Sequence, residues 1–353
     1  MANKSFNTSD PFSCNWPTEK NFLSTLDHFP ELWATIIFRP ILIGLGTIGS
    51  LLIFTVQMRE IKKTSTTVYL TIMSLSSIII MWSNFPSYVL TVWSGSMDSE
   101  VAWQTRPDWH KIRGLTEWLE STAIWITDCT LVIFSVERLL CTMKPLRFLN
   151  MFTVKRALLF ELGIATLSGL VNSITLVLYY SEGLKTLIVI WYEATLKLDC
   201  ARIVCTWLIL MVTNITLVRL ISTLAEARQS LVANRGNGSP SSSGGLETGA
   251  STILLLCSAL IYSAAQFPWM IYQVLTQLEL PPVCWIQLSK RTTVLCFIFA
   301  ALLSLFGYAV DFYVYYIFSA SFRRQMNSLC ARSARHARGH AVHSAITHTT
   351  TAI

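Results

Sequence analysis

Residues 292–318 read TTVLCFIFAALLSLFGYAVDFYVYYIF and contain a single charged residue, Asp311. The hydrocarbon core of a bilayer is about 30 Å thick, so a helix that crosses it needs roughly 20 predominantly apolar residues. This run therefore predicts a transmembrane helix. Six further runs have a similar character, at residues 32–57, 67–92, 115–141, 154–180, 201–224 and 250–277. None alternates polar and apolar residues as the strands of a membrane barrel do, so we expect an all-α bundle of seven transmembrane helices.

The composition indicates lipid as the main solvent. Of the 353 residues, 52% are hydrophobic and 13% are charged, whereas a soluble domain has about 25% charged residues. The net charge of +7 comes from residues that flank the apolar runs, so nucleic acid is not an expected partner. No metalloprotease, serine-hydrolase or phosphate-loop motif occurs in the sequence. We therefore expect neither an enzyme nor a metal site, and no cofactor.

The distribution of Lys and Arg predicts the orientation. These residues are concentrated in the segments that begin at residues 58, 142, 225 and 319, and positive residues stay on the cytoplasmic side. We therefore expect a multi-pass protein of the plasma membrane, with its N-terminus outside and its C-terminus in the cytoplasm. Residues 1–31 form the outer segment, lack the apolar stretch of a signal peptide, and contain candidate glycosylation sites at Asn3 and Asn7. The inner loop 225–249 is rich in Gly and Ser and is predicted to be a flexible linker.

A charged motif stands at the inner end of the third predicted span. Glu137, Arg138 and Leu139 are followed by Lys144-Pro145-Leu146. An acid next to an arginine can hold it by a charge-assisted hydrogen bond. A simpler interpretation is an arginine that snorkels at the membrane edge.

The seventh span carries a second motif, residues 311–315 (DFYVY), and Phe322 follows seven residues after Tyr315. Together the two motifs resemble those of rhodopsin-class G protein-coupled receptors, and the likeness covers residues 40 to 330. Gly46, Gly49, Pro86 and Pro268 also stand where the family has matching residues.

The resemblance implies that Glu137, Arg138 and Tyr315 form the switch that meets a heterotrimeric G protein. It also implies a short amphipathic eighth helix over residues 319–330, before a cytoplasmic tail over 331–353. Cys330 is then a candidate palmitoylation site, which would anchor this helix to the lipid surface. An ordinary unmodified cysteine is the alternative.

Several family landmarks are replaced in this chain. Ser77 stands in place of the second-span Asp, Arg113 in place of the outer-disulfide Cys, and Ala165 in place of the fourth-span Trp. Asp311 occupies the seventh-span position that is usually Asn, so Asp311, Ser77 and Thr127 are expected to form a buried polar site with sodium as its candidate ion. A passive protonated Asp311 is the alternative.

The outer cysteines are Cys14, Cys200 and Cys284 on the predicted topology. An odd number in an oxidising compartment leaves one unpaired, and the sequence allows three pairings.

Two acids of the third span are the candidate ligand contacts. Glu120 lies eighteen residues before Arg138, where amine-binding relatives place their ligand-pairing Asp, and Glu117 lies one turn away. Gln266, within the altered sixth-span motif, is a further hydrogen-bonding candidate. Acids within a membrane are functional candidates, although Glu120 could instead pair with an internal base such as Arg113.

These acids fit a cationic ligand. The chain resembles invertebrate FMRFamide-like neuropeptide receptors, which implies a cationic, amidated peptide as the extracellular partner. A biogenic amine is the alternative ligand. A proton- or cation-coupled transporter or channel is the alternative from another functional class, with four acids along its path: Glu117, Glu120, Asp128 and Asp311.

Overall fold

A computed structural model describes residues 30–59, 64–94, 107–144, 152–180, 185–234, 244–279, 290–319 and 322–328. Within these ranges nearly every residue is helical and no strand occurs, so the all-α prediction is confirmed there. The long helices are α1 (Pro30–Arg59), α2 (Ser65–Ser94), α4 (Pro107–Met143), α6 (Val154–Tyr180), α7 (Lys185–Asn234), α8 (Gly244–Glu279) and α9 (Lys290–Phe318).

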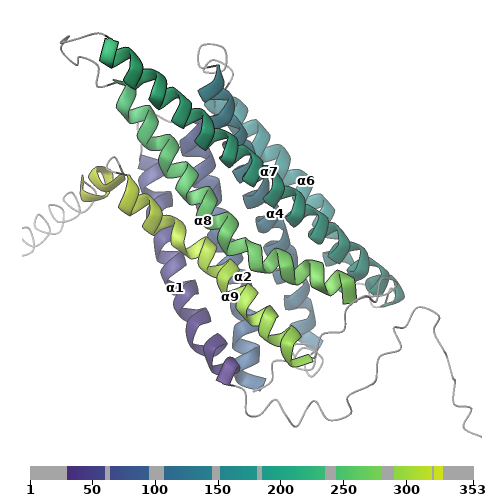
Figure 1. Ribbon diagram of the computed structural model, residues 1–353. Helices are drawn as coiled ribbons and strands as arrows, with labels where there is room; N and C mark the ends of the chain where they lie inside the picture. The colour runs from purple at the N-terminus through teal and green to yellow at the C-terminus, as the bar shows by residue number, and fades with distance from the viewer. Residues whose placement is uncertain are drawn as a thin grey trace, which may run out of the picture.

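The helices pack lengthwise into one bundle (Figure 1). Their contacts close a ring in the order α1, α2, α4, α7, α8 and α9, in which the last helix packs back onto the first. Helix α6 lies outside this ring, where it packs mainly against α4. The ring therefore encloses an interior that six helices share.

Within the described residues, five helices are long and apolar enough to cross a membrane: α1, α2, α6, α7 and α9. A helix occupies each of the seven predicted runs, but α4 and α8 are not among these five. Helix α4 carries Glu120, Asp128 and Glu137, which interrupt its apolar sequence. That α4 and α8 also span the membrane stays a prediction.

The burial pattern agrees with a lipid environment. On α6 the large side chains of Leu159, Leu162 and Leu170 are among the most exposed, with Leu159 at 70%. In contrast, polar side chains such as Thr127 and Glu137 are buried. A water-soluble protein buries its apolar groups and exposes its charged ones. We conclude that the bundle is embedded in a membrane, with its polar residues turned inward.

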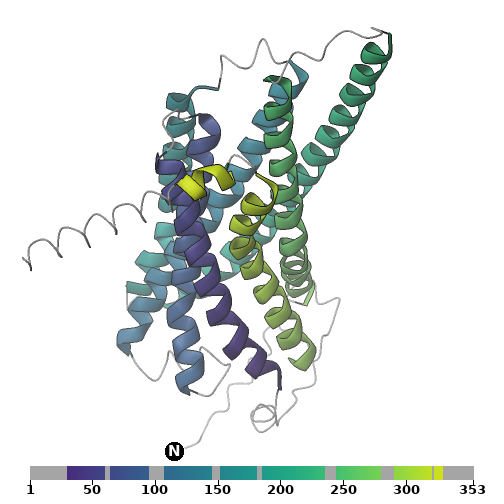
Figure 2. The same ribbon diagram turned by 90° about the vertical axis from the view of Figure 1, so that its left-hand side faces the viewer.

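Three helices are clearly longer than their apolar runs predict. Helix α7 continues to Asn234 and extends beyond the rest of the bundle at one end (Figure 2). Its last ten residues, AEARQSLVAN, are mostly strong helix formers, so helix replaces the first part of the predicted linker 225–249. Helix α8 begins at Gly244, and residues 235–243 lie outside the described part of the chain. Helix α4 begins at Pro107, because proline suits the first helical turn.

Side-chain caps set two helix starts near the predicted inner end. The Thr67 amide donates to the Thr64 hydroxyl at 3.3 Å, and the Thr64 amide donates to the Thr67 hydroxyl at 3.4 Å. This reciprocal pair fixes the start of α2. Ser319 accepts a bond from the Phe322 amide at 3.1 Å, and residues 322–328 are helical. They lie where the short eighth helix is predicted, and its place on a lipid surface stays a prediction.

Pro40 links α1 to α2 through a freed carbonyl. Proline has no N–H, so the Ile36 carbonyl four residues earlier loses its helical partner. The Tyr88 hydroxyl of α2 donates to this carbonyl at 3.2 Å. A hydrogen bond between helices therefore forms at Ile36, less than one turn from Arg39 on α1.

Helix α1 also packs closely against α9 at Gly49. A Cβ added there would lie 2.7 Å from the Phe312 Cβ, closer than real Cβ contacts allow. By contrast, an added Cβ at Gly44, on the same helix, meets nothing within 4 Å. Gly49, unlike Gly44, therefore has no room for a side chain.

We predict that Gly49→Ala destabilises the bundle by about 1–3 kcal/mol, because overpacking forces the backbones of α1 and α9 apart. Thermal unfolding of the purified chain in detergent tests this. Gly44→Ala is the matched control, and it should be neutral or slightly stabilising because alanine favours helix over glycine by about 1 kcal/mol. Equal effects of the two variants would contradict the close contact.

Candidate functional site

The helix ring encloses a cavity of about 300 Å³. All six ring helices line it, and the residues that α1 contributes come from the first third of that helix, at the predicted outer end. Four charged side chains line the cavity: Arg39, Glu120, Asp128 and Arg202. Most of its remaining wall is apolar or aromatic, with five ring-bearing residues: Trp207, Tyr262, Trp269, Phe297 and Tyr308. An apolar pocket with a few converging polar groups is the usual form of a ligand site.

The deepest charged pair joins α4 to α7. Arg202 donates to the Asp128 carboxylate, and these two side chains are 11% and 6% exposed. The guanidinium also donates to Asp199 at 3.2 Å and lies over the Trp125 ring, 5.6 Å from its centre. A buried charge is tolerated only when it is paired and hydrogen-bonded, and this arginine meets both conditions.

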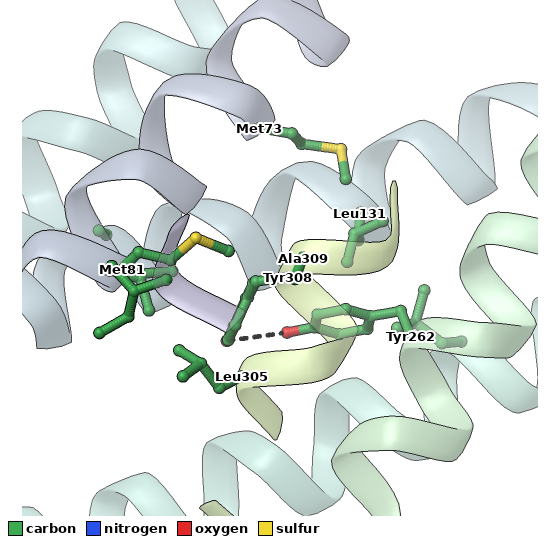
Figure 3. Packing of buried hydrophobic residues seen from close by; sticks show 11 residues of the cluster. Met73, Met81, Leu131, Tyr262, Leu305, Tyr308 and Ala309 are labelled. Carbon is green, nitrogen blue, oxygen red and sulfur yellow. Dashed lines mark hydrogen bonds between the residues drawn. The ribbon is translucent and has the colours of Figure 1, made fainter. Parts of the chain in front are cut away.

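The Asp128 carboxylate extends this pair to α8 and α9. The Tyr262 hydroxyl of α8 donates to Asp128 at 2.6 Å and lies 3.4 Å from the Tyr308 hydroxyl of α9. Figure 3 shows the two tyrosines facing each other within a buried core that includes Leu305. Polar contacts thus connect four helices beside the cavity.

A second charged group joins α1, α2 and α4. Arg39 donates to the Asn84 side-chain oxygen at 2.5 Å, and the Asn84 amide nitrogen donates to Glu120 at 2.7 Å. Asn84 thus bridges the arginine and the carboxylate. Glu120, the first candidate ligand contact, therefore lines the cavity, but it already has an internal partner.

Glu117, the second candidate, is not part of the cavity lining. It forms an ion pair with Arg113 at 2.7 Å, one turn away on α4, and its side chain is 36% exposed. The internal base Arg113 therefore pairs with Glu117, whereas Glu120 is bonded through Asn84.

Gln266, the third candidate, lines the cavity from α8. Its side-chain oxygen accepts a bond from Ser304 at 3.0 Å. Its Nε2 is buried and lacks a hydrogen-bond partner within the described residues, as does the Thr35 hydroxyl of α1. Both groups belong to residues of the cavity wall, so they are available to a bound molecule.

The predicted switch residues lie toward the opposite end of the bundle. Glu137 accepts a bond from Ser65 at 2.6 Å, and Arg138 donates to Thr66, so both side chains bond to the start of α2. The ion pair expected between Glu137 and Arg138 is not found among the described contacts. The reason is that the two neighbours on α4 have separate hydroxyl partners.

Arg138 and Tyr315 line one narrow cleft of about 10 Å³, together with residues of α2, α7 and α8. The Arg138 guanidinium lies over the Phe134 ring, 5.3 Å from its centre. Its Nε and the Glu137 Oε2 have no hydrogen-bond partner in the part of the chain that the structure covers. The structure thus brings together two of the three predicted switch residues, from α4 and α9.

The buried polar residues around Asp311 have a different arrangement from the predicted one. Ser258 of α8 donates to Asp311 at 3.0 Å. Ser77 and Thr127 are buried, and the Thr127 hydroxyl bonds to the Ala123 carbonyl of its own helix at 2.9 Å. No described contact joins Asp311 to either of them, and sodium binding stays a prediction.

Of the remaining predicted site residues, Cys200 alone lies in the described part of the chain. Cys200 lies within α7. Cys14, Cys284, Asn3, Asn7 and Cys330 lie outside the described residues, so disulfide pairing, glycosylation and palmitoylation stay predictions.

Arg39, Asn84 and Arg202 are site residues that sequence reasoning does not single out. The two arginines count there as part of the basic charge that sets orientation. Each nevertheless interrupts an apolar run, and ionisable residues within a membrane usually mark a functional site. The rule that selects Glu120 would have selected these arginines as well.

Comparison with protein-family models and with curated proteins gives no match for this chain.

We predict that Asp128→Asn destabilises the protein by up to about 3–5 kcal/mol, because it removes the more deeply buried of the two carboxylates that contact Arg202 and leaves only Asp199 beside it. Denaturant titration in detergent micelles measures the change. The double variant Asp128→Asn/Arg202→Gln should recover part of the loss. Glu117→Gln, which breaks a half-exposed pair, should cost less than about 1 kcal/mol. A loss from Asp128→Asn no larger than that would contradict a buried pair.

Proposed function

We propose that this chain is a receptor of the rhodopsin class, which passes the binding of an extracellular ligand to a heterotrimeric G protein. The observation that carries this proposal is one helix ring with two separate features. A charged cavity opens among its six helices toward the predicted outer end, and a cleft lined by Arg138 and Tyr315 lies toward the other end. A signal-transmitting bundle requires this arrangement of two sites.

The partners follow from the two sites. Lipid surrounds the apolar exterior of the bundle, with the N-terminus outside the plasma membrane and the C-terminus in the cytoplasm. The G protein meets the Arg138 cleft, where charged groups have unfilled hydrogen-bonding capacity. The ligand fills the cavity, whose volume is near the lower limit of about 300–1,000 Å³ for ligand pockets. It is therefore a small molecule or one end of a peptide.

A neuropeptide with a cationic, amidated end is the ligand that the family resemblance implies, with its cation near Glu120. Glu120 already accepts a hydrogen bond from Asn84, so the cation of the ligand must share or displace this bond.

We predict that Arg138→Gln reduces agonist-evoked GTP exchange on purified G protein by at least about tenfold, because the cleft loses its charged donor. Cells that express the chain would first be screened with amidated peptides, amines and amino acids. Agonist binding, measured by thermal stabilisation of the purified receptor, should stay within about threefold of wild type, since Arg138 is remote from the cavity. Arg219→Gln, at an exposed arginine of α7, is the matched control. Full exchange by Arg138→Gln would contradict its role.

A proton- or cation-coupled transporter is the second candidate, favoured by the acids inside the bundle, among them Asp128 and Glu161. Buried acids of this kind can carry protons or cations. Substrate-driven uptake or current in liposomes without G protein would support this function. Ligand-dependent GTP exchange without such flux would support the receptor.

A further inference from the structure

Opposite charges lie side by side in the cavity. Among the described residues two arginines and two carboxylates line it, and Asp199, outside the lining, is a further carboxylate bonded to Arg202. Asp128 and Arg202 are in direct contact. Arg39 and Glu120 are instead joined only through the side chain of Asn84. The second pair is therefore separated by one small polar group.

The Asn84 amide presents two opposite functions from adjacent atoms. Its oxygen accepts from Arg39 at 2.5 Å, and its nitrogen donates to Glu120 at 2.7 Å. The same nitrogen also donates to the Ile80 carbonyl at 2.9 Å, within α2. An acceptor facing the arginine and a donor facing the carboxylate are thus held side by side.

A ligand with one net charge does not suit the paired charges of Arg39 and Glu120. A cation placed against Glu120 leaves the Arg39 charge without its nearest counter-charge, and an anion placed against Arg39 does the same to Glu120. In an apolar surrounding such an unbalanced charge is costly. A zwitterion adds no net charge, and its two groups can satisfy both residues at once.

The rest of the wall indicates what else the ligand carries. Trp207, Trp269 and Phe297 provide an aromatic surface, and Trp269 and Phe297 have ring centres 5.9 Å apart. The Gln266 Nε2, on a residue that is 8% exposed, is a buried donor beside Tyr308 that makes no hydrogen bond of ordinary geometry within the described residues. Buried polar groups are normally hydrogen-bonded, so this donor calls for an acceptor on the ligand.

We propose that the cavity binds an α-amino-acid-like zwitterion with an aromatic side group. Its carboxylate takes the position of the Asn84 oxygen against Arg39, and its ammonium takes the position of the Asn84 nitrogen against Glu120. The aromatic group packs against Trp207 and Trp269. This inference rests on the proposed receptor function only in that the cavity is a ligand site, and it replaces a purely cationic ligand by a zwitterionic one.

Four forms of phenylalanine test the charge pattern. The probes are free phenylalanine, phenylalanine amide, N-acetylphenylalanine and N-acetylphenylalanine amide, which are zwitterionic, cationic, anionic and neutral. Binding is measured by thermal stabilisation and by isothermal titration with the purified full-length chain. Free phenylalanine should bind at least about tenfold tighter than the other three, since each of these lacks a charge-assisted bond.

Variants of the cavity test the two charged ends of the ligand separately. Arg39→Gln and Glu120→Gln should each weaken phenylalanine binding by at least about tenfold. Asn84→Ala should strengthen it, because the ligand no longer displaces a bridging group, and weaker binding would contradict the proposed exchange. Arg219→Gln is the control for loss of an arginine outside the cavity. Arg39→Lys keeps the charge and supplies a second variant if Arg39→Gln does not fold.

Two results would overturn the proposal. One is equal or tighter binding of phenylalanine amide, which would favour a cationic ligand at Glu120. The other is no preference for phenylalanine over the doubly blocked form at millimolar concentration. GTP exchange, measured on the same preparations, tests the receptor function separately. Zwitterion binding without exchange would support the ligand class and count against the receptor.

Discussion

The ion pair between Asp128 and Arg202 is the contact on which the interior of this bundle depends. Two opposite charges lie between α4 and α7, and Tyr262 of α8 donates to the same carboxylate. In a membrane bundle neither charge is solvated by bulk water, so each requires an opposite charge beside it, and Asp199 supplies a second carboxylate at Arg202. The spacing of α4, α7 and α8 is therefore set by a polar contact rather than by apolar packing alone, and the cavity lies beside it.

A second, weaker polar contact, between α1, α2 and α4, also shapes the cavity. Helix α1 carries a charged residue, Arg39, whose counter-charge Glu120 belongs to α4, and Asn84 of α2 fills the distance between them. Direct contact would have closed the space, whereas the bridge leaves both groups accessible along the wall. The four charges thus have two different roles. The Asn84 bridge between Arg39 and Glu120 can be displaced by a ligand, whereas the ion pair between Asp128 and Arg202 holds the helices in place.

The apolar runs predict where helices form, because the need to satisfy every backbone group in lipid leaves few alternatives. They do not predict how far helices continue beyond the membrane, as the helical residues 225–234 demonstrate. The sequence also does not predict which side chains bond to one another between helices. Glu117 and Glu120 are three residues apart, yet one pairs within α4 and the other bonds to α2. Which faces meet depends on helix rotation, and sequence spacing alone does not fix that rotation.

Helix α8 contributes residues to both the cavity and the Arg138 cleft. Tyr262 lines the cavity, and Ser258, one turn away on α8, lines the Arg138 cleft and donates to Asp311. Tyr315 lies one turn beyond Asp311 on α9 and lines the same cleft. Polar side chains on two adjoining helices therefore run from the cavity to the cleft without leaving the buried interior. Pro268 interrupts the hydrogen bonding of α8 on the cavity side of Tyr262. Asp128 and Asp311, which belong to two different helices, therefore accept hydrogen bonds from hydroxyl groups that lie one turn apart on α8.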